Sequence, residues 1–364
     1  MPRNTIAISF VLLIVIPTLA PPVFGEWESD SWLENVIGPE RISLGDEFGC
    51  QGYEGVDINS DPWSIAACMD YLSEKSPSSR WGERPISFGL GGKETLPSTE
   101  SAIIDAGFEI VGDGSVGGDG LQFFPINGGT LEKNVANVSQ LESAEQDAIV
   151  SIGWIARIHD LRVREDKDAI SWLEQQEVWF TTWGEWHHHK IAGSRIAVAT
   201  NGSTISVTMQ ESESWTVPGT VKLHFDGAIR EISSQTRDEL PLLQSSDRHL
   251  EVGWREFDGG MFLTMGPGDM VTIELESQPE SVLSTPWITF NGLHHAVTVV
   301  GQHTTNLFQW SSDFQGSELR FTWLIERGFS EDLDWTLPLL ALGIIIAVPV
   351  FVRLIIKRDQ MTHD

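Results

Sequence analysis

Up to about residue 190, short apolar runs alternate along the chain with segments of helical periodicity. Alternation of this kind is typical of β/α units, in which helices pack on a parallel sheet. The expected strands cover residues 42–44, 85–90, 108–111, 148–158 and 178–182, and the expected helices cover 61–72, 98–106 and 166–176. The pattern therefore predicts an α/β domain over residues 26–190.

Beyond residue 190 the helical periodicity ends and the pattern becomes one of hairpins. Asn201-Gly202 separates two alternating apolar and polar runs, which is a strong signal for a two-residue hairpin turn. Further short strands are expected at 221–225, 250–254, 261–264, 271–275, 296–300 and 319–325. Many short strands without a helical period predict an antiparallel β-sandwich over 191–328.

The N-terminus has the features of a secretory signal peptide. Arg3 precedes an apolar run over 6–16, and small residues stand before a cleavage point at Glu26. The apolar run is too short for a ~30 Å bilayer core, so residues 1–25 are predicted to be removed. An uncleaved N-terminal anchor is the alternative.

The C-terminus suggests a membrane anchor. Residues 335–352 carry no charge, and Arg353 can extend its side chain to the membrane surface. Acidic residues precede this stretch and basic residues follow it. This pattern predicts a transmembrane helix over 335–356 and a cytoplasmic tail over 357–364. The expected protein is thus a single-pass protein of the cell membrane, with its N-terminus outside.

The composition limits the partners of the predicted ectodomain. The chain has 52 acidic and 23 basic residues, a formal net charge of −29, and this acidity excludes a nucleic-acid-binding surface. With 15 Trp and 17 Phe it can bury substantial cores, which excludes a disordered stalk. Two cysteines, Cys50 and Cys68, predict one disulfide in an exported protein, which closes a short loop and contributes ~3 kcal/mol at most.

Four short blocks of the first domain, in this order, resemble the polysaccharide deacetylase family. Residues 41–49 look like its first strand, which ends in Asp-Asp-Gly, and 103–113 look like its block with Gly-His-Glu-Ile and Asn-His. Residues 124–128 are similar to its Arg-Pro-Pro-Tyr-Gly loop. Residues 173–186, with Val-Trp-Phe-Thr-Thr-Trp-Gly-Glu, give the best match. The resemblance covers under half of the chain and implies a distorted β/α barrel.

The same resemblance implies a catalytic site of two acidic residues and two histidines around a metal ion, which would activate water. Asp46 and Glu47 stand at the position of the acidic pair. Asp113 stands in place of the first histidine and Gly117 in place of the second, while Phe124 replaces the arginine. These departures predict either a degenerate barrel without catalysis or a site with rebuilt chemistry.

A histidine run at 187–189 could supply the rebuilt chemistry. In an extended chain, His187 and His189 point the same way, so their imidazoles can share a divalent metal such as zinc. Asp113 or the acidic pair, at neighbouring strand ends, would complete the site. The alternative is three exposed histidines that end a loop. His294, His295 and His303 also resemble a metal cluster, but we favour a structural or surface role for them.

Two functions of different classes are therefore expected. The first is recognition of a glycan or envelope polysaccharide by a non-catalytic barrel, in which Trp183 and Trp186 stack on sugar rings. The second is a divergent metal-dependent polysaccharide deacetylase or hydrolase, which requires Asp46, Glu47, Asp113 and His187 to converge in one pocket. A structural protein of the cell envelope that binds no ligand is the third possibility.

Overall fold

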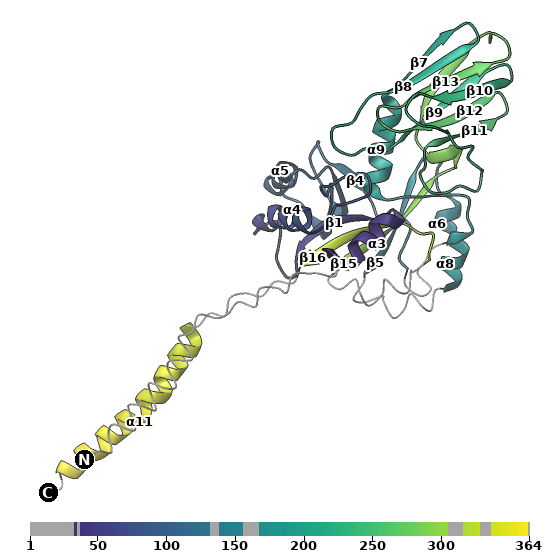
Figure 1. The fold of residues 1–364 in the computed structure, drawn as a ribbon. Helices are drawn as coiled ribbons and strands as arrows, with labels where there is room; N and C mark the ends of the chain where they lie inside the picture. The colour runs from purple at the N-terminus through teal and green to yellow at the C-terminus, as the bar shows by residue number, and fades with distance from the viewer. Residues whose placement is uncertain are drawn as a thin grey trace. The chain divides into compact units, whose positions relative to one another are not determined.

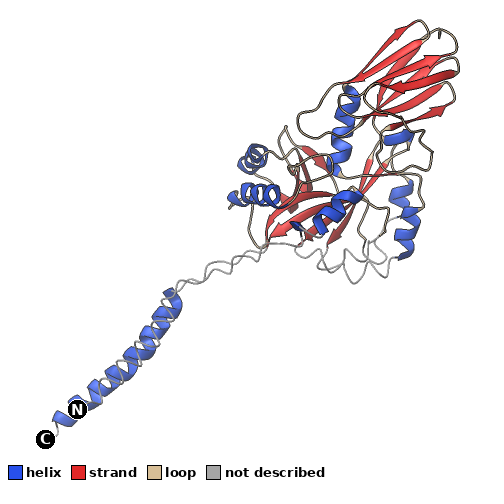
Figure 2. Ribbon diagram, in the orientation of Figure 1, coloured by secondary structure: helices blue, strands red, loops and turns tan. Residues whose placement is uncertain are grey.

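The structure, a computed structural model, consists of two units, one up to Arg327 and one from Gly328 onward. It describes residues 33–34, 37–131, 138–155, 167–304, 316–327 and 336–362. The predicted signal peptide lies outside the described residues. Figure 2 shows a mixed sheet-and-helix region and an antiparallel region in the first unit.

A curved parallel sheet forms the centre of the first unit (Figure 1). Its strands are β1 (Glu47–Tyr53), β2 (Ser87–Glu94), β3 (Ile110–Ser115), β4 (Gln122–Phe124), β5 (Ile149–Ile155), β6 (Trp179–Phe180), β15 (Ala296–Thr304) and β16 (Phe321–Arg327). Their order is β4-β3-β2-β1-β16-β15-β5, with β6 also paired to β15, and every pairing is parallel. The parallel half-barrel agrees with the predicted α/β class.

The chain that follows β4 continues the sheet toward β5. Gly128 N donates to Ser151 O at 2.8 Å, and Leu131 N donates to Gly153 O at 3.0 Å. In return, Gly153 N donates to Gly129 O at 2.9 Å. These backbone bonds place the segment after β4 beside β5.

Helices α3 (Ile37–Leu44), α4 (Trp63–Lys75), α5 (Pro97–Ala106), α6 (Val138–Glu142) and α8 (Lys167–Glu174) belong to this part. The predicted disulfide is confirmed, because Cys50 of β1 is bonded to Cys68 of α4. Both cysteines are fully buried in the same core as Phe48 and Phe88. The disulfide therefore ties α4 to the centre of the sheet.

Residues 42–44, predicted as a strand, lie in helix α3 instead. Pro39 and Glu40 are in the first turn of this helix, and Gly45 follows its last residue with a φ of +101°. Proline near the start and a left-handed glycine just past the end are signals of a helix. The first strand consequently begins at Glu47, so Asp46 and Glu47 lie at its amino end.

The antiparallel part consists of two four-stranded sheets that share one core. The strands are β7 (Ile196–Asn201), β8 (Thr204–Met209), β9 (Gly219–Phe225), β10 (Ile229–Ser234), β11 (Gly253–Phe257), β12 (Gly260–Met265), β13 (Met270–Leu275) and β14 (Val282–Trp287). The sheet orders are β10-β13-β8-β7 and β11-β12-β9-β14. Val207 and Ile273 from the first sheet pack with Leu223 and Leu263 from the second. A two-residue hairpin turn joins β7 to β8 as predicted, but it consists of Gly202 and Ser203, because Asn201 ends β7 and pairs with Thr204.

Two strands that were assigned to the sandwich from their sequence belong to the parallel sheet. After the 3-10 helix η1 (Phe290–Gly292), β15 pairs with β5 and β16, and β16 pairs with β1. Residues 296–300 and 321–325 are buried without alternation. Continuous burial is typical of central parallel strands, which are covered on both faces. The sandwich is thus inserted into the chain of the parallel sheet.

The described part of the second unit is helix α11 (Thr336–Thr362), and the transmembrane prediction for it is wrong. Among the described residues, no helix combines the length and apolar character needed to cross a bilayer. The predicted spanning helix over 335–356, the cytoplasmic tail over 357–364 and the single-pass membrane localisation are therefore withdrawn.

Candidate metal centre

Helix α9 (Trp183–Ser194) carries the three consecutive histidines and begins at the amino edge of the parallel sheet. Thr182 is its N-cap, and its side chain accepts a hydrogen bond from Glu185 N at 3.2 Å. Glu47, the first residue of β1, accepts a hydrogen bond from Gly184 N at 2.7 Å and one from the Ser87 hydroxyl at 2.5 Å. The first turn of α9 is thus fixed to β1 and β2.

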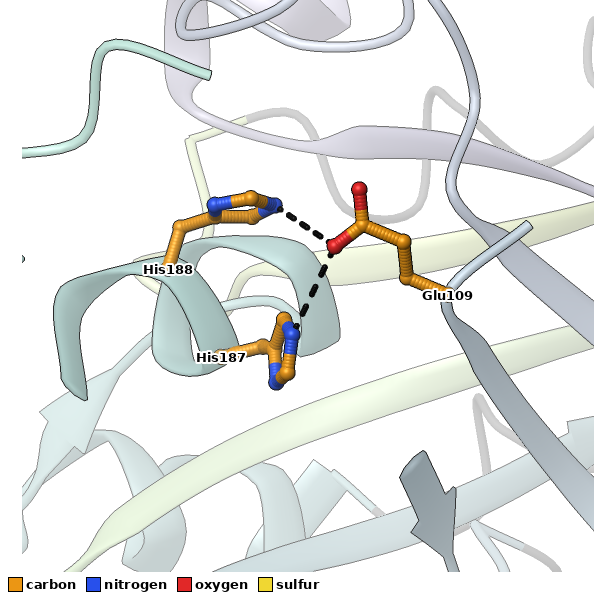
Figure 3. A group of neighbouring side chains, drawn as sticks. All are labelled: Glu109, His187 and His188. Atoms are coloured by element: carbon orange, nitrogen blue, oxygen red, sulfur yellow. Dashed lines mark ion pairs between the residues drawn. The ribbon is translucent and has the colours of Figure 1, made fainter. Parts of the chain in front are cut away.

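The second turn of α9 brings two imidazoles to one carboxylate (Figure 3). Glu109 immediately precedes β3, so it also lies at the amino edge of the sheet. Its Oε2 atom is 3.6 Å from His187 Nε2 and 3.4 Å from His188 Nε2. One ligand atom from each of the three side chains lies within 4.8 Å of the others. Among the described residues, no other three His, Cys, Asp or Glu side chains meet this criterion.

The two histidines are held by aromatic neighbours. The ring of His188 stacks on Trp215, with centroids 5.4 Å apart and planes 13° apart. Trp215 occupies a slot that only glycine permits, since a Cβ atom at Gly82 or Gly184 would lie 2.4 or 2.6 Å from the indole. His187 packs edge-on against Phe124 of β4. Because this packing already orders the two rings, they lose less rotamer freedom when a metal ion binds.

The charges in this cluster are complementary. His187, and after it His188, lower the pKa of Glu109 to about 2, against the desolvation that would raise it. Glu109 is therefore a carboxylate throughout the neutral range, and it is 43% exposed. An anionic oxygen beside two imidazole nitrogens forms a donor set that divalent metals of the zinc type accept.

The geometry of His188 tests this donor set further. His188 is only 9% exposed, and its Nε2 atom has no hydrogen-bond partner within the described part of the chain. A buried polar atom without a hydrogen bond is costly. The contact that it does make is an ion pair with Glu109 Oε2, 3.4 Å away. The residues present therefore fit a metal ion with three protein ligands and an open position.

Asp46, expected as a catalytic acid or base, is instead held in a closed buried network. Arg41 Nε donates to it at 2.6 Å, Phe321 N at 3.1 Å and Trp323 Nε1 at 2.8 Å. Asp46 is 0% exposed. The Asp46 carboxyl group, which accepts hydrogen bonds from all three of these donors, joins α3, β1 and β16.

Glu47, the second expected acid, is also fully buried, and burial raises the pKa of its carboxyl group. Hydrogen bonds from Ser87 and Gly184 oppose that rise. Asp113 lies in β3 with a φ of +56° and is half-buried. Asp46, Glu47, Asp113 and His187 do not form a common ligand group within the described residues. The convergence that the deacetylase hypothesis requires is therefore not observed.

His187 and His189 do not share an orientation, because the chain is helical where an extended segment was expected. In a helix, side chains two positions apart point to nearly opposite sides. His189 is fully buried, packs edge-on against Trp179, and its Nδ1 lies 2.7 Å from Pro218 O. It belongs to the packing between α9 and the sandwich, and His188 is the second histidine of the cluster.

The tryptophans expected to stack on sugar rings are core residues. Trp183 is completely buried, and its indole nitrogen donates to the Ser151 hydroxyl at 2.9 Å. Trp186 is 8% exposed and packs edge-on against Phe124. Neither ring has a free face large enough for a sugar. The side chain of His303 lies outside the described residues.

The sequence analysis missed Glu109 and His188. Glu109 stands alone before an apolar run, and no motif links it to the histidines. Comparisons of the chain with models of known families, with curated proteins and with solved structures found no match. The resemblance to polysaccharide deacetylases accordingly stays a prediction.

Proposed function

We propose that this protein binds a divalent transition-metal ion, with zinc as the first choice, through Glu109, His187 and His188. The observation that carries the proposal is the meeting of two imidazole nitrogens and one carboxylate oxygen within 4.8 Å. Zinc accepts this combination of nitrogen and oxygen ligands, and three protein ligands leave one tetrahedral position open.

The position of the cluster limits the proposal to binding. A zinc ion in such a site can polarise a carbonyl group or lower the pKa of a bound water molecule. In β/α barrels, however, catalytic residues gather at the carboxyl ends of the strands. Glu109 precedes β3 and α9 starts beside the amino ends of β1 and β2, so the cluster lies at the opposite edge.

Metal content tests the proposal directly. The full chain is stripped with a chelator, incubated with zinc, passed through a desalting column and analysed for zinc per polypeptide. We expect one tightly held zinc in the wild type and a loss of at least tenfold in affinity for His187→Ala and His188→Ala.

The matched control is His224→Ala, because His224 is an exposed histidine on β9, outside the cluster. This variant should keep the zinc stoichiometry of the wild type. Equal zinc retention by all three variants, or no retention by the wild type, would contradict the proposal.

Recognition of a glycan remains a second candidate function, but the tryptophans that were expected to contact the sugar are not available for it. Trp183 and Trp186 are too buried to stack on a sugar ring. A glycan would have to use other aromatic and polar side chains, and one cavity of the first unit offers such a set.

A further inference from the structure

A cavity of about 360 Å³ lies between helices α6 and α8 and the amino end of β15. Its polar and aromatic lining consists of Glu142, Trp172, Gln176, Glu177, His294 and His295. It shares no residue with the Glu109–His187–His188 cluster. The volume falls near the lower end of the range of small-molecule sites, which is ~300–1,000 Å³.

The two histidines in the wall form an interacting pair. Their Nδ1 atoms are 3.2 Å apart and their rings are nearly perpendicular, at 88°. One Nδ1 must carry a proton and the other must accept it, because two lone pairs would repel. Burial, followed by the neighbouring His294, lowers the pKa of His295 to about 4. His295 is therefore a neutral imidazole at neutral pH.

The second nitrogen of His295 is unsatisfied. The residue is 8% exposed, and its Nε2 atom has no hydrogen-bond partner in the described part of the chain. A buried polar atom of this kind costs about 1–3 kcal/mol unless a water molecule or a ligand bonds to it. Because this atom is also sealed from solvent, it does not face the cavity, and His295 contributes the rest of its ring to the wall.

The turn that precedes β5 contacts the backbone of this pair and has an unusual conformation. Asp147 has a φ of +60°, which is rare for a residue other than glycine, and its amide donates to His294 O at 2.8 Å. Its Oδ1 atom is also buried without a hydrogen-bond partner among the described residues. Asp147 does not itself line the cavity, so it positions the backbone at His294 and makes no contact with a ligand there.

The charge of the lining determines the class of ligand. Glu142 and Glu177 contribute carboxyl groups, Gln176 contributes an amide, and no lysine or arginine lines the cavity. This environment disfavours an anion. Trp172 offers an indole ring beside these hydrogen-bonding groups. A flat apolar face combined with many donors and acceptors is the complement of a sugar ring.

We propose that this cavity binds a monosaccharide unit that is neutral or positively charged, with the ring beside Trp172 and its hydroxyl or amino groups beside the carboxyl groups of Glu142 and Glu177. The inference does not depend on the metal proposal, because the two sites have no residue in common. Zinc binding and sugar binding can therefore fail separately.

The test is ligand-observed NMR on the full chain with neutral hexoses, hexosamines and hexuronates, including glucose, glucosamine and glucuronate. We expect saturation transfer to at least one neutral or amino sugar and none to the uronates. Binding of no hexose or hexosamine, or preferential binding of uronates, would overturn the proposal.

Variants locate the binding site. Trp172→Ala should weaken sugar binding by about tenfold or more, which corresponds to ~1.4 kcal/mol. Because Trp172 also packs on the core, Glu177→Lys serves as a second variant at an exposed position. It should weaken the binding of a hexosamine more than the binding of a neutral hexose. Glu213→Ala is the matched control at an exposed acidic residue outside the lining and should bind like the wild type. Unchanged binding in both Trp172→Ala and Glu177→Lys would place the sugar elsewhere and refute the assignment.

Discussion

Two carboxylates at the amino edge of the parallel sheet, Asp46 and Glu109, are held in different ways. Asp46 is fully buried, and Arg41, Phe321 N and Trp323 Nε1 all donate to it. Glu109 is partly exposed and faces two imidazoles at 3.4 and 3.6 Å, one of which has a buried nitrogen without a hydrogen bond. The first arrangement is complete without a ligand. The second places three potential metal ligands close together. We therefore assign a metal-binding role to Glu109 and a structural role to Asp46.

The largest effect on stability is expected from removing the hydrogen-bond network around Asp46. Asp46→Ala leaves Arg41 as a buried charge without its partner, and breaking a buried ion pair in this way costs about 3–5 kcal/mol. Urea unfolding of the metal-free protein measures the loss. Asp57→Ala is the control, since Asp57 pairs with Lys93 on the surface, and its unfolding midpoint should barely change. A small effect of Asp46→Ala would show that the network contributes little.

The next largest effect on stability is expected from the protonation of His189, which lies on the buried face of α9. Burial lowers the pKa of His189 to about 4 from its ordinary 6.5. Between pH 6.5 and 4 the unfolded chain therefore binds more protons than the folded chain, and stability falls as the pH falls through this window. The shift corresponds to about 3 kcal/mol over the whole window, and His295 contributes in the same direction.

Unfolding free energies at pH 7.5 and pH 5 test this prediction. A His189→Gln variant is expected to be less stable than the wild type at pH 7.5, but to lose less stability on acidification. If the variant and the wild type lose the same amount, His189 is not the group that titrates.

Zinc should stabilise the folded chain by a somewhat smaller amount. A ligand at a hundred times its Kd raises the free energy of unfolding by ~2.7 kcal/mol if it binds only the folded state. We expect this gain in wild type and in the His224→Ala control, and its loss in Glu109→Gln. Thermal unfolding with and without zinc measures it. A gain that persists in Glu109→Gln would contradict the assignment of the ligands.

The smallest effect is that of Glu109→Gln in the absence of metal. The Glu109 carboxylate is partly exposed, so its attraction to the histidines is screened, and the loss should be at most about 1 kcal/mol. Because the pKa of Glu109 is lowered to about 2, this contribution is present above pH 4.5 and disappears as the pH falls toward 2. Urea unfolding at pH 7.5 and pH 3 measures it. A loss as large as that of Asp46→Ala would make Glu109 a structural residue.

Local signals in the sequence account for much of the fold. The hairpin between β7 and β8, to within one residue at its turn, the helix over α5 and the disulfide between Cys50 and Cys68 could all be predicted from short-range rules. The sequence pattern Thr182-x-x-Glu185, which is typical of a helix start, was also present, and Thr182 caps α9. Recognising it would have shown that the histidines are helical, and that His187 and His189 cannot face one metal together.

Long-range pairing could not be predicted in the same way. Residues 296–300 and 319–325 were predicted as strands, but the sequence did not show which sheet they join across the inserted sandwich. Glu109 and His188 meet only because β3 and α9 reach the same edge of that sheet. The acidic pair at Asp46 and Glu47 was misplaced for a related reason, since the position of the first strand depends on the helix that ends at Leu44, just before Gly45.

The most direct test of the account is X-ray absorption at the zinc edge of the zinc-loaded full chain. The predicted first shell contains two imidazole nitrogens at ~2.0–2.1 Å and one carboxylate oxygen at ~2.0–2.2 Å, together with a light-atom ligand in the fourth position. In Glu109→Gln and His188→Ala the tightly bound zinc should be lost or its shell changed. A first shell with fewer than two imidazoles in the wild type, or an unchanged shell in both variants, would contradict a metal site at Glu109, His187 and His188.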